Sequence, residues 1–382
     1  MDTTGKAPAS RYQLKLEALK KAAREEGLGS VILYSSGQLS MLEVNPVLWI
    51  SGYLPMGAHS LALVTENRDP ALFLSLPWDV GRAKRQSWIQ DVQAPSDMAQ
   101  ASHAWLASAG VADKPAGLIG GDFMPATLYD RLARVASVGI QKADGLLSAL
   151  DKFPDPEDRE RLREAGRLAD LGFQAILDHA RVGMRESDLA AEMEYAMRSR
   201  GAEDNFGMVS ASDHNHGVHP PQDRKLKPGD IIIAEITPAI GGHFVQLCRT
   251  ATLGPASTLV KEKFKVLEES FARSLAVTKP GHRAGEIAIA MNEVFGKAGY
   301  AEYCRPPYMR VRGHGLGFQT MPFEEIVEEN QSEIKPGMVF VVHPNQYIPE
   351  TGYLMLGDTV QITENGHELL TKTEPKLFSI EI

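Results

Sequence analysis

Apolar and polar positions along the chain follow helical and strand periodicities in turn. From residue 11 to 26, apolar side chains recur at helical spacings, and Gly27 favours an end to that helix. Short apolar runs bounded by turn residues predict strands, and two further helical patterns lie between them. The predicted strands span 31–34, 60–64, 71–74 and 118–119, and the predicted helices span 99–109 and 126–136. The first half is therefore predicted to be an α/β domain.

A short polar segment separates the two halves. Residues 151–157 contain two prolines, several charges and little periodicity, as interdomain linkers do. A chain of 382 residues also exceeds the size at which one hydrophobic core usually keeps growing. We therefore predict two domains, residues 1–152 and 153–382, and a loose tail over the first ten residues.

Helical and strand patterns also alternate beyond this segment. Helices are predicted around 162–176, 187–199, 258–278 and 284–298, and strands near 230–237, 244–251, 308–313, 338–343 and 358–363. This mixture is typical of an α+β domain. The sequence shows neither a repeat of fixed short period nor a low-complexity segment.

The overall charge favours a small soluble ligand. The formal net charge is −9 at pH 7 and the pI is near 5.7, without long blocks of like charge. Such a chain lacks the basic surface that binds nucleic acid or acidic lipid. We therefore expect a small-molecule substrate, and neither nucleic acid nor a membrane as partner.

Cysteine usage and hydropathy indicate the compartment. Cys248 and Cys304 are the only cysteines, too few for a disulfide framework and without the spacing of a zinc site. The N-terminal residues lack an apolar signal core, and no run approaches eighteen apolar residues. We expect a cytoplasmic protein.

Four motifs follow one another in the second half. In the first, a Gly229-Asp230 turn leads into a strand that ends at Glu235, and Gln246 follows eleven residues later. The other three are Gly313-His314-Gly315-Leu316-Gly317, Pro336-Gly337-Met338-Val339-Phe340-Val341-Val342-His343-Pro344 and Gly357-Asp358-Thr359-Val360-Gln361-Ile362-Thr363. This order resembles the pita-bread superfamily of creatinase, prolidase and methionine aminopeptidase.

The resemblance implies the fold and the assembly. It implies an α+β protein with a C-terminal pita-bread domain, preceded by a smaller α/β domain of the creatinase type. Members with that N-terminal domain are typically homodimers in which each N-terminal domain reaches the active site of the partner. We therefore expect a homodimer.

The metal ligands that the resemblance implies have mostly been replaced. The family set is two Asp, one His and two Glu, and the corresponding positions here are Glu235, Gln246, His314, His343 and Gly357. A dinuclear site needs several carboxylates, because they offset the mutual repulsion of the two cations. We therefore predict that the protein needs no cofactor. The alternative is one divalent transition metal ion on Glu235, His314 and His343.

The acid–base groups of the peptidases are replaced as well. These enzymes use a second His seven residues after His314, and that position is Met321, followed by Pro322 where a Glu is common. The resemblance therefore disfavours a prolidase or Xaa-Pro aminopeptidase, which we keep as an alternative.

His219 matches the position of the proton-shuttling His of creatinase, which breaks a C–N bond without a metal. Histidine suits this role because its pKa near 6.5 lets it take and return a proton at neutral pH. The competing interpretation is a solvated loop residue, which we prefer for the nearby His214 and His216. The carboxylates that creatinase uses for its cationic substrate are replaced by Cys248 and His343, so creatine itself is disfavoured.

Other side chains are candidates for binding the substrate. Since side chains alternate along a strand, Phe244, Gln246 and Cys248 share one face, and Glu235 shares another with Ile233 and Thr237. Gln246 and Cys248 are expected to line the pocket. Cys248 is either a pocket-lining residue or a nucleophile, and the latter needs a base or cation nearby.

Two arginines precede the second motif. If their segment is a strand, Arg310 and Arg312 point to the same face and are candidates for a substrate carboxylate. The alternative is that both are solvated surface residues.

The sequence as a whole predicts a creatinase-like, metal-independent hydrolase of a C–N bond in a small non-peptide molecule. Glu235 and His219 handle protons, and His314 and His343 polarise the substrate. The alternatives are a lyase or hydrolase with one metal ion, an Xaa-Pro aminopeptidase or prolidase, and a non-catalytic binding module. The substrate, the choice between hydrolysis and elimination, and the nucleophile (Glu235 or Cys248) stay open.

Overall fold

The protein was studied as a computed structural model that describes residues 9–37, 39–135, 139–318 and 325–382. The chain divides into two compact units, Met1–Lys152 and Phe153–Ile382. Within the described ranges, no helix has the length and apolar character needed to cross a membrane. Met321 and Pro322, from which the loss of the peptidase acid–base groups was predicted, lie outside the described residues.

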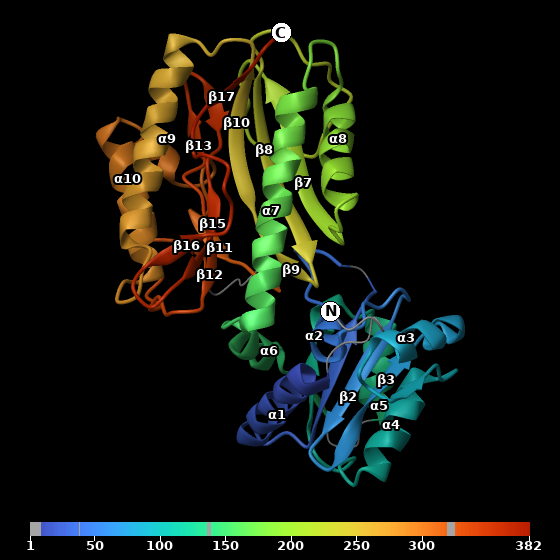
Figure 1. The fold of residues 1–382 in the computed structure, drawn as a ribbon. Helices are drawn as coiled ribbons and strands as arrows, with labels where there is room; N and C mark the ends of the chain where they lie inside the picture. Colours follow the sequence, from blue (N-terminus) through green and yellow to red (C-terminus); the bar gives the residue numbers. More distant parts are fainter. Residues whose placement is uncertain (1–8, 38, 136–138, 319–324) are drawn as a thin grey trace. The chain divides into compact units, whose positions relative to one another are not determined.

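The first unit contains a mixed six-stranded sheet in the order β4-β3-β2-β1-β5-β6 (Figure 1). Its strands are β1 (Ser30–Ser35), β2 (Ser60–Thr65), β3 (Arg68–Leu74), β4 (Asp91–Gln93), β5 (Ala116–Ile119) and β6 (Ile140–Lys142). Its helices are α1 (Ala9–Glu25), α2 (Pro46–Ser51), α3 (Val80–Gln86), α4 (Met98–Ser108), α5 (Ala126–Val135) and α6 (Asp144–Asp151), with short 3-10 turns at Pro77–Asp79 and Gly121–Phe123. The central strand β1 pairs antiparallel with β2 and parallel with β5.

The second unit contains two larger sheets and two pairs of helices. One sheet has the order β17-β10-β8-β7, the other has the order β11-β12-β15-β16, and β13 and β14 form a small hairpin. The helices are α7 (Pro156–His179), α8 (Glu186–Arg198), α9 (Thr258–Val277) and α10 (Ala284–Lys297), with a 3-10 turn at Ala301–Cys304. The strands are β7 (Asp204–Ser212), β8 (Ile231–Ile240), β9 (His243–Phe244), β10 (Leu247–Leu253), β11 (Gly313–Gly315), β12 (Val339–Val342), β13 (Gln346–Ile348), β14 (Gly352–Leu354), β15 (Asp358–Ile362), β16 (His367–Leu369) and β17 (Phe378–Ile380).

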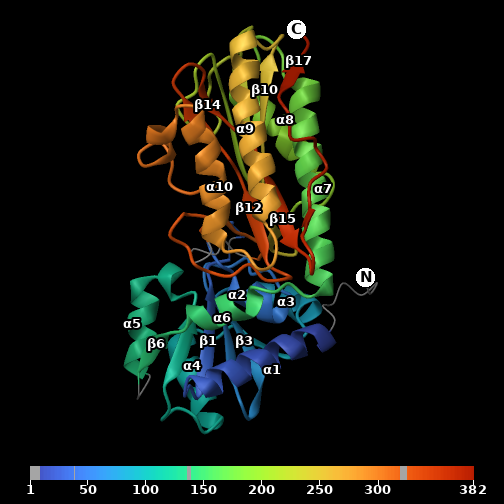
Figure 2. The same ribbon diagram turned by 90° about the vertical axis from the view of Figure 1, so that its left-hand side faces the viewer.

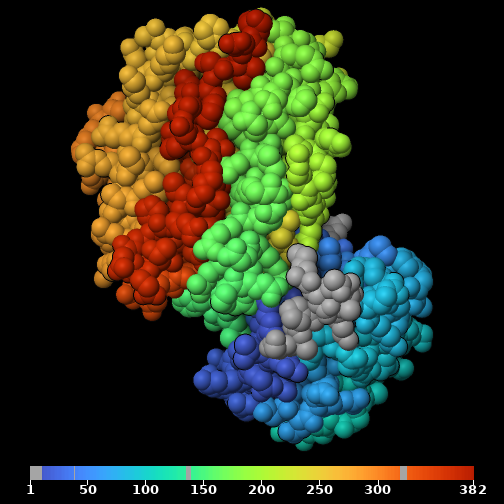
Figure 3. Space-filling model, viewed as in Figure 1, coloured from blue at the N-terminus to red at the C-terminus, as the bar shows by residue number. Residues whose placement is uncertain are grey.

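Helix α7 begins at a capping residue followed by a proline. The Asp155 carboxylate accepts a hydrogen bond from the Asp158 backbone N–H at 2.9 Å, and Pro156 occupies the first helical position. The helix buries an apolar stripe against the sheet. On its other side the C-terminal segment lies alongside it, as the red strip beside green α7 in Figure 3 shows. There the Asp170 carboxylate accepts hydrogen bonds from the backbone of Lys372 and Thr373.

Strand β8 divides the interior of the second unit into two cores. Ile232, Ala234 and Ile236 face the core formed with α7 and α8. Ile231 and Ile233 face the core formed with α9 and α10, which lie side by side (Figure 2). Because side chains alternate along a strand, Glu235 continues the second face, toward the core that contains Cys248.

The predicted elements of both halves are present, with specific corrections. The strand predicted at 308–313 is wrong: only Gly313 belongs to a strand, β11, and the residues before it have no regular structure. The strand predicted near 244–251 is two strands, β9 and β10. Strand β7 was not predicted, because Asp204-Asn205 and Gly207 are poor strand formers and only its pairing with β8 makes it a strand.

Candidate active site

Glu235 lies in the middle of the sheet. On β8 it stands between Cys248 of β10 and Met208 of β7, each directly opposite on a neighbouring strand. Its carboxylate makes no hydrogen bond or ion pair within the described residues. Burial raises its pKa to about 7, because a charged carboxylate is poorly solvated there. Glu235 is therefore a carboxyl group that exchanges a proton near neutral pH.

Cys248 is fully buried at the centre of the site. Its sulfur accepts hydrogen bonds from the side-chain amides of Gln246, at 3.5 Å, and Asn345, at 3.8 Å. Its backbone exchanges two hydrogen bonds with Gly357. Burial and, after it, the charge of Glu235 raise the pKa of the Cys248 thiol far above its usual range. A protonated thiol is a weak nucleophile, so Cys248 is a pocket-lining residue, which was one of the two predicted roles.

His314, on β11, and His343, directly after the end of β12, lie close together. Their rings are 6.0 Å apart between centroids, in an edge-to-face arrangement. Burial, followed by the charge of His314, lowers the pKa of His343 to about 3, and burial also lowers the pKa of His314. His314 Nδ1 donates to the Gly315 carbonyl at 2.9 Å, which leaves Nε2 as an acceptor. Both rings are therefore neutral at pH 7 and are free to bind an ion or a donor group.

Gly357 is tied to His343 by close packing. A Cβ atom placed on Gly357 would lie 2.5 Å from the Cβ and 2.9 Å from the Cα of His343. Real Cβ atoms do not approach backbone atoms this closely, so a side chain at 357 requires the backbone to move. Gly357 therefore allows this close approach of the two segments, and position 357 has no room for a ligand side chain in this arrangement.

Three buried polar atoms of this site have no hydrogen-bond partner within the described residues. They are Thr237 Oγ1, Gln246 Oε1 and His343 Nδ1. An unsatisfied buried polar atom costs about 1–3 kcal/mol, and native structures contain few of them. Thr237 lies on the strand of Glu235, and Gln246 bonds to Cys248, which is opposite Glu235. These unpaired groups indicate that a substrate, water or ion completes the site.

Tyr353 was not predicted, but it belongs to this site. It lies on β14 and packs against the apolar core that contains Cys248. Burial and the charges of Glu235 and Cys248 raise the pKa of its phenol. No motif position marks Tyr353 in the sequence, and only the β13–β14 hairpin brings it to Cys248.

His219 lies at the edge of the same core. The Ser210 hydroxyl bonds to both the backbone N–H and the carbonyl of His219, and Ser210 is two residues from Met208, which faces Glu235. His219 Nδ1 donates to the Pro220 carbonyl at 2.9 Å. Within the described ranges, His219 makes no hydrogen bond or ring contact with Glu235, His314 or His343. The predicted convergence of all four therefore stays a prediction.

The face predicted for Glu235 needs correction. Glu235 is directly opposite Cys248, and residues opposite each other in an antiparallel pair point to the same side. Glu235 therefore shares the face of Gln246 and Cys248 instead of another one. Phe244 is fully buried, and its N–H donates to the Gly317 carbonyl at 2.7 Å.

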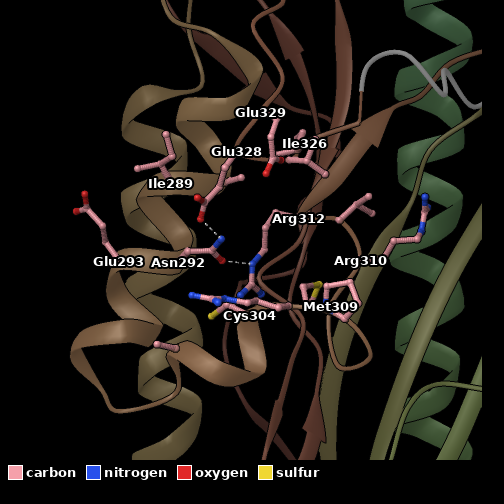
Figure 4. Close-up of a pocket in the computed structure, with 16 residues that line it drawn as sticks. Ile289, Asn292, Glu293, Cys304, Met309, Arg310, Arg312, Ile326, Glu328 and Glu329 are labelled. Carbon is pink, nitrogen blue, oxygen red and sulfur yellow. Dashed lines mark hydrogen bonds between the residues drawn. The ribbon is translucent and has the colours of Figure 1, made fainter.

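Arg310 and Arg312 do not point the same way, because their segment is not a strand. Figure 4 shows the Arg312 guanidinium turned toward Asn292 and Cys304, and Arg310 turned away from them. Arg310 is exposed and pairs with Glu325, whereas Arg312 is 2% exposed. The prediction of a shared face is wrong, and only Arg312 is sequestered from solvent.

Comparison with known proteins assigns both units. Residues 160–364 match the profile of metallopeptidase family M24, and residues 15–152 match the profile of the creatinase/prolidase N-terminal domain. The chain belongs to metallopeptidase family M24. The predicted superfamily, the α+β fold class and the order of the pita-bread domain after a creatinase-type domain are thereby confirmed.

The proteins similar to this chain have peptidase names. The Xaa-Pro dipeptidase of Pyrococcus furiosus is 30% identical over 244 residues, which cover 63% of this chain and 68% of that protein. The uncharacterized peptidase YqhT of Bacillus subtilis is 31% identical, covering 58% and 63%. The prolidase structure from Pyrococcus horikoshii matches with a TM-score of 0.82 at 22% identity, covering 94% of this chain and 99% of that one.

The family assignment confirms one prediction and overturns another. M24 peptidases are hydrolases of carbon–nitrogen bonds, so the predicted enzyme class is confirmed at that level. The prediction that the protein needs no cofactor is wrong, because the matching profile is that of a metallopeptidase family, and the alternative of a divalent metal ion agrees with it. The predicted non-peptide substrate receives no support from these relatives.

The side chains at the ligand positions of the family offer one carboxylate, too few for a metal pair. Within the described ranges, no three His, Cys, Asp or Glu side chains form a group that could hold a metal ion, so the predicted set of Glu235, His314 and His343 is not assembled. An ion would therefore need a donor of another type, such as the unpartnered Gln246 Oε1. Gln246, Glu235 and His343 would offer oxygen and nitrogen donors of the kind that a divalent transition metal takes.

Proposed function

We propose that this chain hydrolyses the amide bond of a small, dipeptide-sized substrate, in a site that takes one divalent metal ion. The observation that carries the proposal is an unpaired Glu235 carboxyl group in a site where two buried polar atoms, Gln246 Oε1 and His343 Nδ1, have no hydrogen-bond partner within the described residues. Structural residues in a native core are normally paired. We infer that a bound ion or substrate provides the partner that these three groups lack.

The substrate class rests on the relatives. Those at about 30% identity are named Xaa-Pro dipeptidase or peptidase, and the bond that a dipeptidase breaks is an amide. The proposal therefore combines two of the alternatives predicted from the sequence. The substrate is that of a prolidase, and the site takes a single metal ion.

Each residue has a role in this proposal. Glu235, Gln246 and His343 would hold the ion, which would supply Lewis acidity. His219, half-buried at the edge of the site, takes a proton from the attacking water and returns it to the leaving amine. His314 presents a neutral Nε2 acceptor that orients a donor of the substrate, and Tyr353 closes the apolar side and excludes water.

Metal binding tests the proposal apart from turnover. Protein purified without chelator should contain about one equivalent of Mn, Fe, Co or Zn per chain. Chelation should lower the melting temperature, and returning the ion should restore it, because an ion that binds only the folded state stabilises it. Glu235→Gln should abolish this shift, whereas Glu262→Gln, an exposed control on α9, should keep it. Two equivalents per chain, or no shift with any of these ions, would contradict the proposal.

A substrate panel tests the reaction. Xaa-Pro dipeptides, other dipeptides and small non-peptide amides should be supplied to the metal-loaded enzyme. We expect turnover of dipeptides, detected as released free amine. Turnover confined to the non-peptide amides would return the substrate to the one first predicted from the sequence.

We further propose that the enzyme is a homodimer, as the two-domain members of the superfamily typically are. The support is the match of residues 15–152 to the creatinase/prolidase N-terminal domain. Light scattering at micromolar concentration should give a mass of two chains. A mass of 41.8 kDa, that of one chain, would contradict it.

A further inference from the structure

A second cavity in the pita-bread unit lies apart from Glu235 and Cys248. It has a volume of about 720 Å³ and lies between α10, the segment 301–312 and the segment 326–329 (Figure 4). Ligand sites of small molecules commonly occupy roughly 300–1,000 Å³. Its wall is mixed: Ile289, Met309 and Ile326 form an apolar part, and charged and polar side chains line the rest. The cavity therefore has the size of a small-molecule site and offers both apolar and charged contacts.

The floor of this cavity holds a buried arginine that pairs with no anionic side chain among the described residues. Arg312 donates to three neutral acceptors: Asn292 Oδ1 at 2.7 Å, the Asn345 carbonyl at 3.0 Å and Gln346 Oε1 at 2.8 Å. Its guanidinium also lies over the Phe295 ring, 4.7 Å from the centroid. A guanidinium has five N–H groups, so these contacts leave donors unused. A buried charge without a counter-ion is unfavourable, and a carboxylate in the cavity would supply one.

The opposite side of the cavity is acidic. Figure 4 shows Glu328 and Glu329 on that side, with Asn292 between them and Arg312. The Asn292 amide donates to the Glu328 carboxylate at 2.6 Å and accepts from Arg312, so it separates the two charges by one side chain. Both glutamates are exposed. A ligand with a carboxylate alone would meet this negative charge, whereas a ligand with a carboxylate and an ammonium group would match both ends.

We propose that this cavity binds a free amino acid with an apolar side chain. Its carboxylate pairs with Arg312, its ammonium group pairs with Glu328 and Glu329, and its side chain lies against Ile289, Met309 and Ile326. Free amino acids are also the products of the dipeptide hydrolysis proposed above, but the binding site does not depend on that reaction.

An occupant of this cavity is connected to the candidate active site by two routes: the Arg312 carbonyl accepts from the His343 N–H at 3.1 Å, and Arg312 also contacts Asn345. The Asn345 carbonyl accepts from Arg312, and the Asn345 side-chain amide donates to Cys248 Sγ. The Asn345 side-chain oxygen also accepts from the Leu356 N–H, next to Gly357. Neutralising Arg312 therefore acts on a residue that packs against the candidate active site.

Calorimetric titration with L-leucine tests the binding. Leucine should bind, and N-acetyl-leucine, which lacks the ammonium group, and leucine amide, which lacks the carboxylate, should each bind about tenfold more weakly or worse. Glu328→Gln and Arg312→Gln should weaken leucine binding by a similar factor. Glu333→Gln, an exposed glutamate outside the cavity lining, is the matched control and should leave it unchanged.

Thiol labelling gives a second readout that needs neither turnover nor a variant. Cys304 lines the cavity, and Cys248 does not. Bound leucine should slow the reaction of Cys304 with a maleimide, followed by mass spectrometry. No heat and no protection of Cys304 at millimolar leucine, equal binding of the two derivatives, or leucine binding that survives both cavity substitutions would each overturn the proposal. Failure of the dipeptidase proposal would instead appear as missing turnover with leucine binding intact.

Discussion

The two faces of strand β10 differ in how their polar groups are satisfied. Arg249, on one face, is fully buried and makes five hydrogen bonds, to the Asp358 carboxylate and to the carbonyls of Cys248, Gly357, Thr373 and Glu374. Only Asp358 Oδ2 in this cluster lacks a partner. On the other face, next to Cys248, Glu235 is unpaired and Gln246 Oε1 is unsatisfied. Arg249 therefore belongs to a closed network, in which nearly every polar group has a partner. Its sequence neighbour Cys248 lies beside an open network, in which polar groups lack partners.

This difference separates groups that hold the fold from groups that are available for chemistry. A closed network resists substitution because removing one member leaves a buried charge without a partner. An open one costs stability in the free protein and is retained where a ligand completes it. Substitutions on the two faces should therefore act on different measurable quantities: stability on the Arg249 face, and turnover and ligand binding on the Glu235 face.

The largest effect on stability is expected for Arg249→Met. The change leaves the buried Asp358 carboxylate without its cation, so the free energy of unfolding should fall by about 3–5 kcal/mol. Denaturant unfolding measures it. Arg163→Met is the matched control, because Arg163 pairs with Glu368 at the surface, and it should cost less than about 1 kcal/mol. Equal losses in both variants would remove the distinction between the closed network and an ordinary ion pair.

On the open face, Glu235→Gln should act on catalysis and spare the fold. Turnover should fall by about a hundredfold or more, since the change removes the carboxylate of the proposed ion site. The free energy of unfolding should stay the same or increase, because a neutral amide is easier to bury than a carboxyl group with a raised pKa. A loss of more than about 1 kcal/mol in stability would place Glu235 among the structural residues.

The pH dependence of stability should have opposite signs for Glu235 and His343. The folded pKa of Glu235, about 7, is raised above its ordinary value of 4.5, so its contribution is complete below pH 4.5 and is lost as pH rises through 7. The folded pKa of His343, about 3, lies below its ordinary 6.5, so its contribution is complete above pH 6.5 and is lost as pH falls toward 3. The two nearly cancel between pH 4.5 and 6.5.

Comparison with the Glu235→Gln variant isolates the contribution of the Glu235 carboxyl group to the pH dependence of stability. In the presence of chelator, the variant should gain up to about 3 kcal/mol relative to the wild-type chain as pH rises from 4.5 to 7. Denaturant unfolding at several pH values measures this difference. A difference that does not change with pH would mean that Glu235 titrates like an exposed carboxyl group.

The sequence predicts which residues occupy the candidate site, but not which of them are opposite each other on neighbouring strands. Four ordered motifs place Glu235, Gln246, His314 and His343 at ligand positions, and strand alternation brings Gln246 and Cys248 to one face. Alternation within one strand cannot tell which residues are opposite each other, because that depends on the register of the neighbouring strand. For this reason the shared face of Glu235 and Cys248 was predicted wrongly.

Long-range contacts account for the residues that were not predicted. Tyr353 and Asn345 reach Cys248 only through the β13–β14 hairpin and the turn before it. The different environments of Arg310 and Arg312 depend on a segment whose pattern of alternating residues looks like a strand, although α10 and segment 326–329 surround it instead of a strand partner. Local patterns predict elements, whereas these contacts join residues more than ninety positions apart in the case of Cys248 and Asn345.

The smallest effect on turnover is expected for Cys248→Ala. Because burial and Glu235 raise the pKa of this thiol, it is protonated at neutral pH and does not attack the substrate. Turnover should therefore stay within about tenfold of the wild-type value, while stability falls by about 1 kcal/mol for the small cavity left behind. If Cys248 were the nucleophile, the variant would instead lose nearly all activity, and the wild-type enzyme would form a covalent adduct that mass spectrometry of the quenched reaction would detect.

Alkylation gives an independent check: the fully buried Cys248 should react more slowly than the half-buried Cys304. Faster labelling of Cys248 would show that the open face of β10 carries an activated thiol after all.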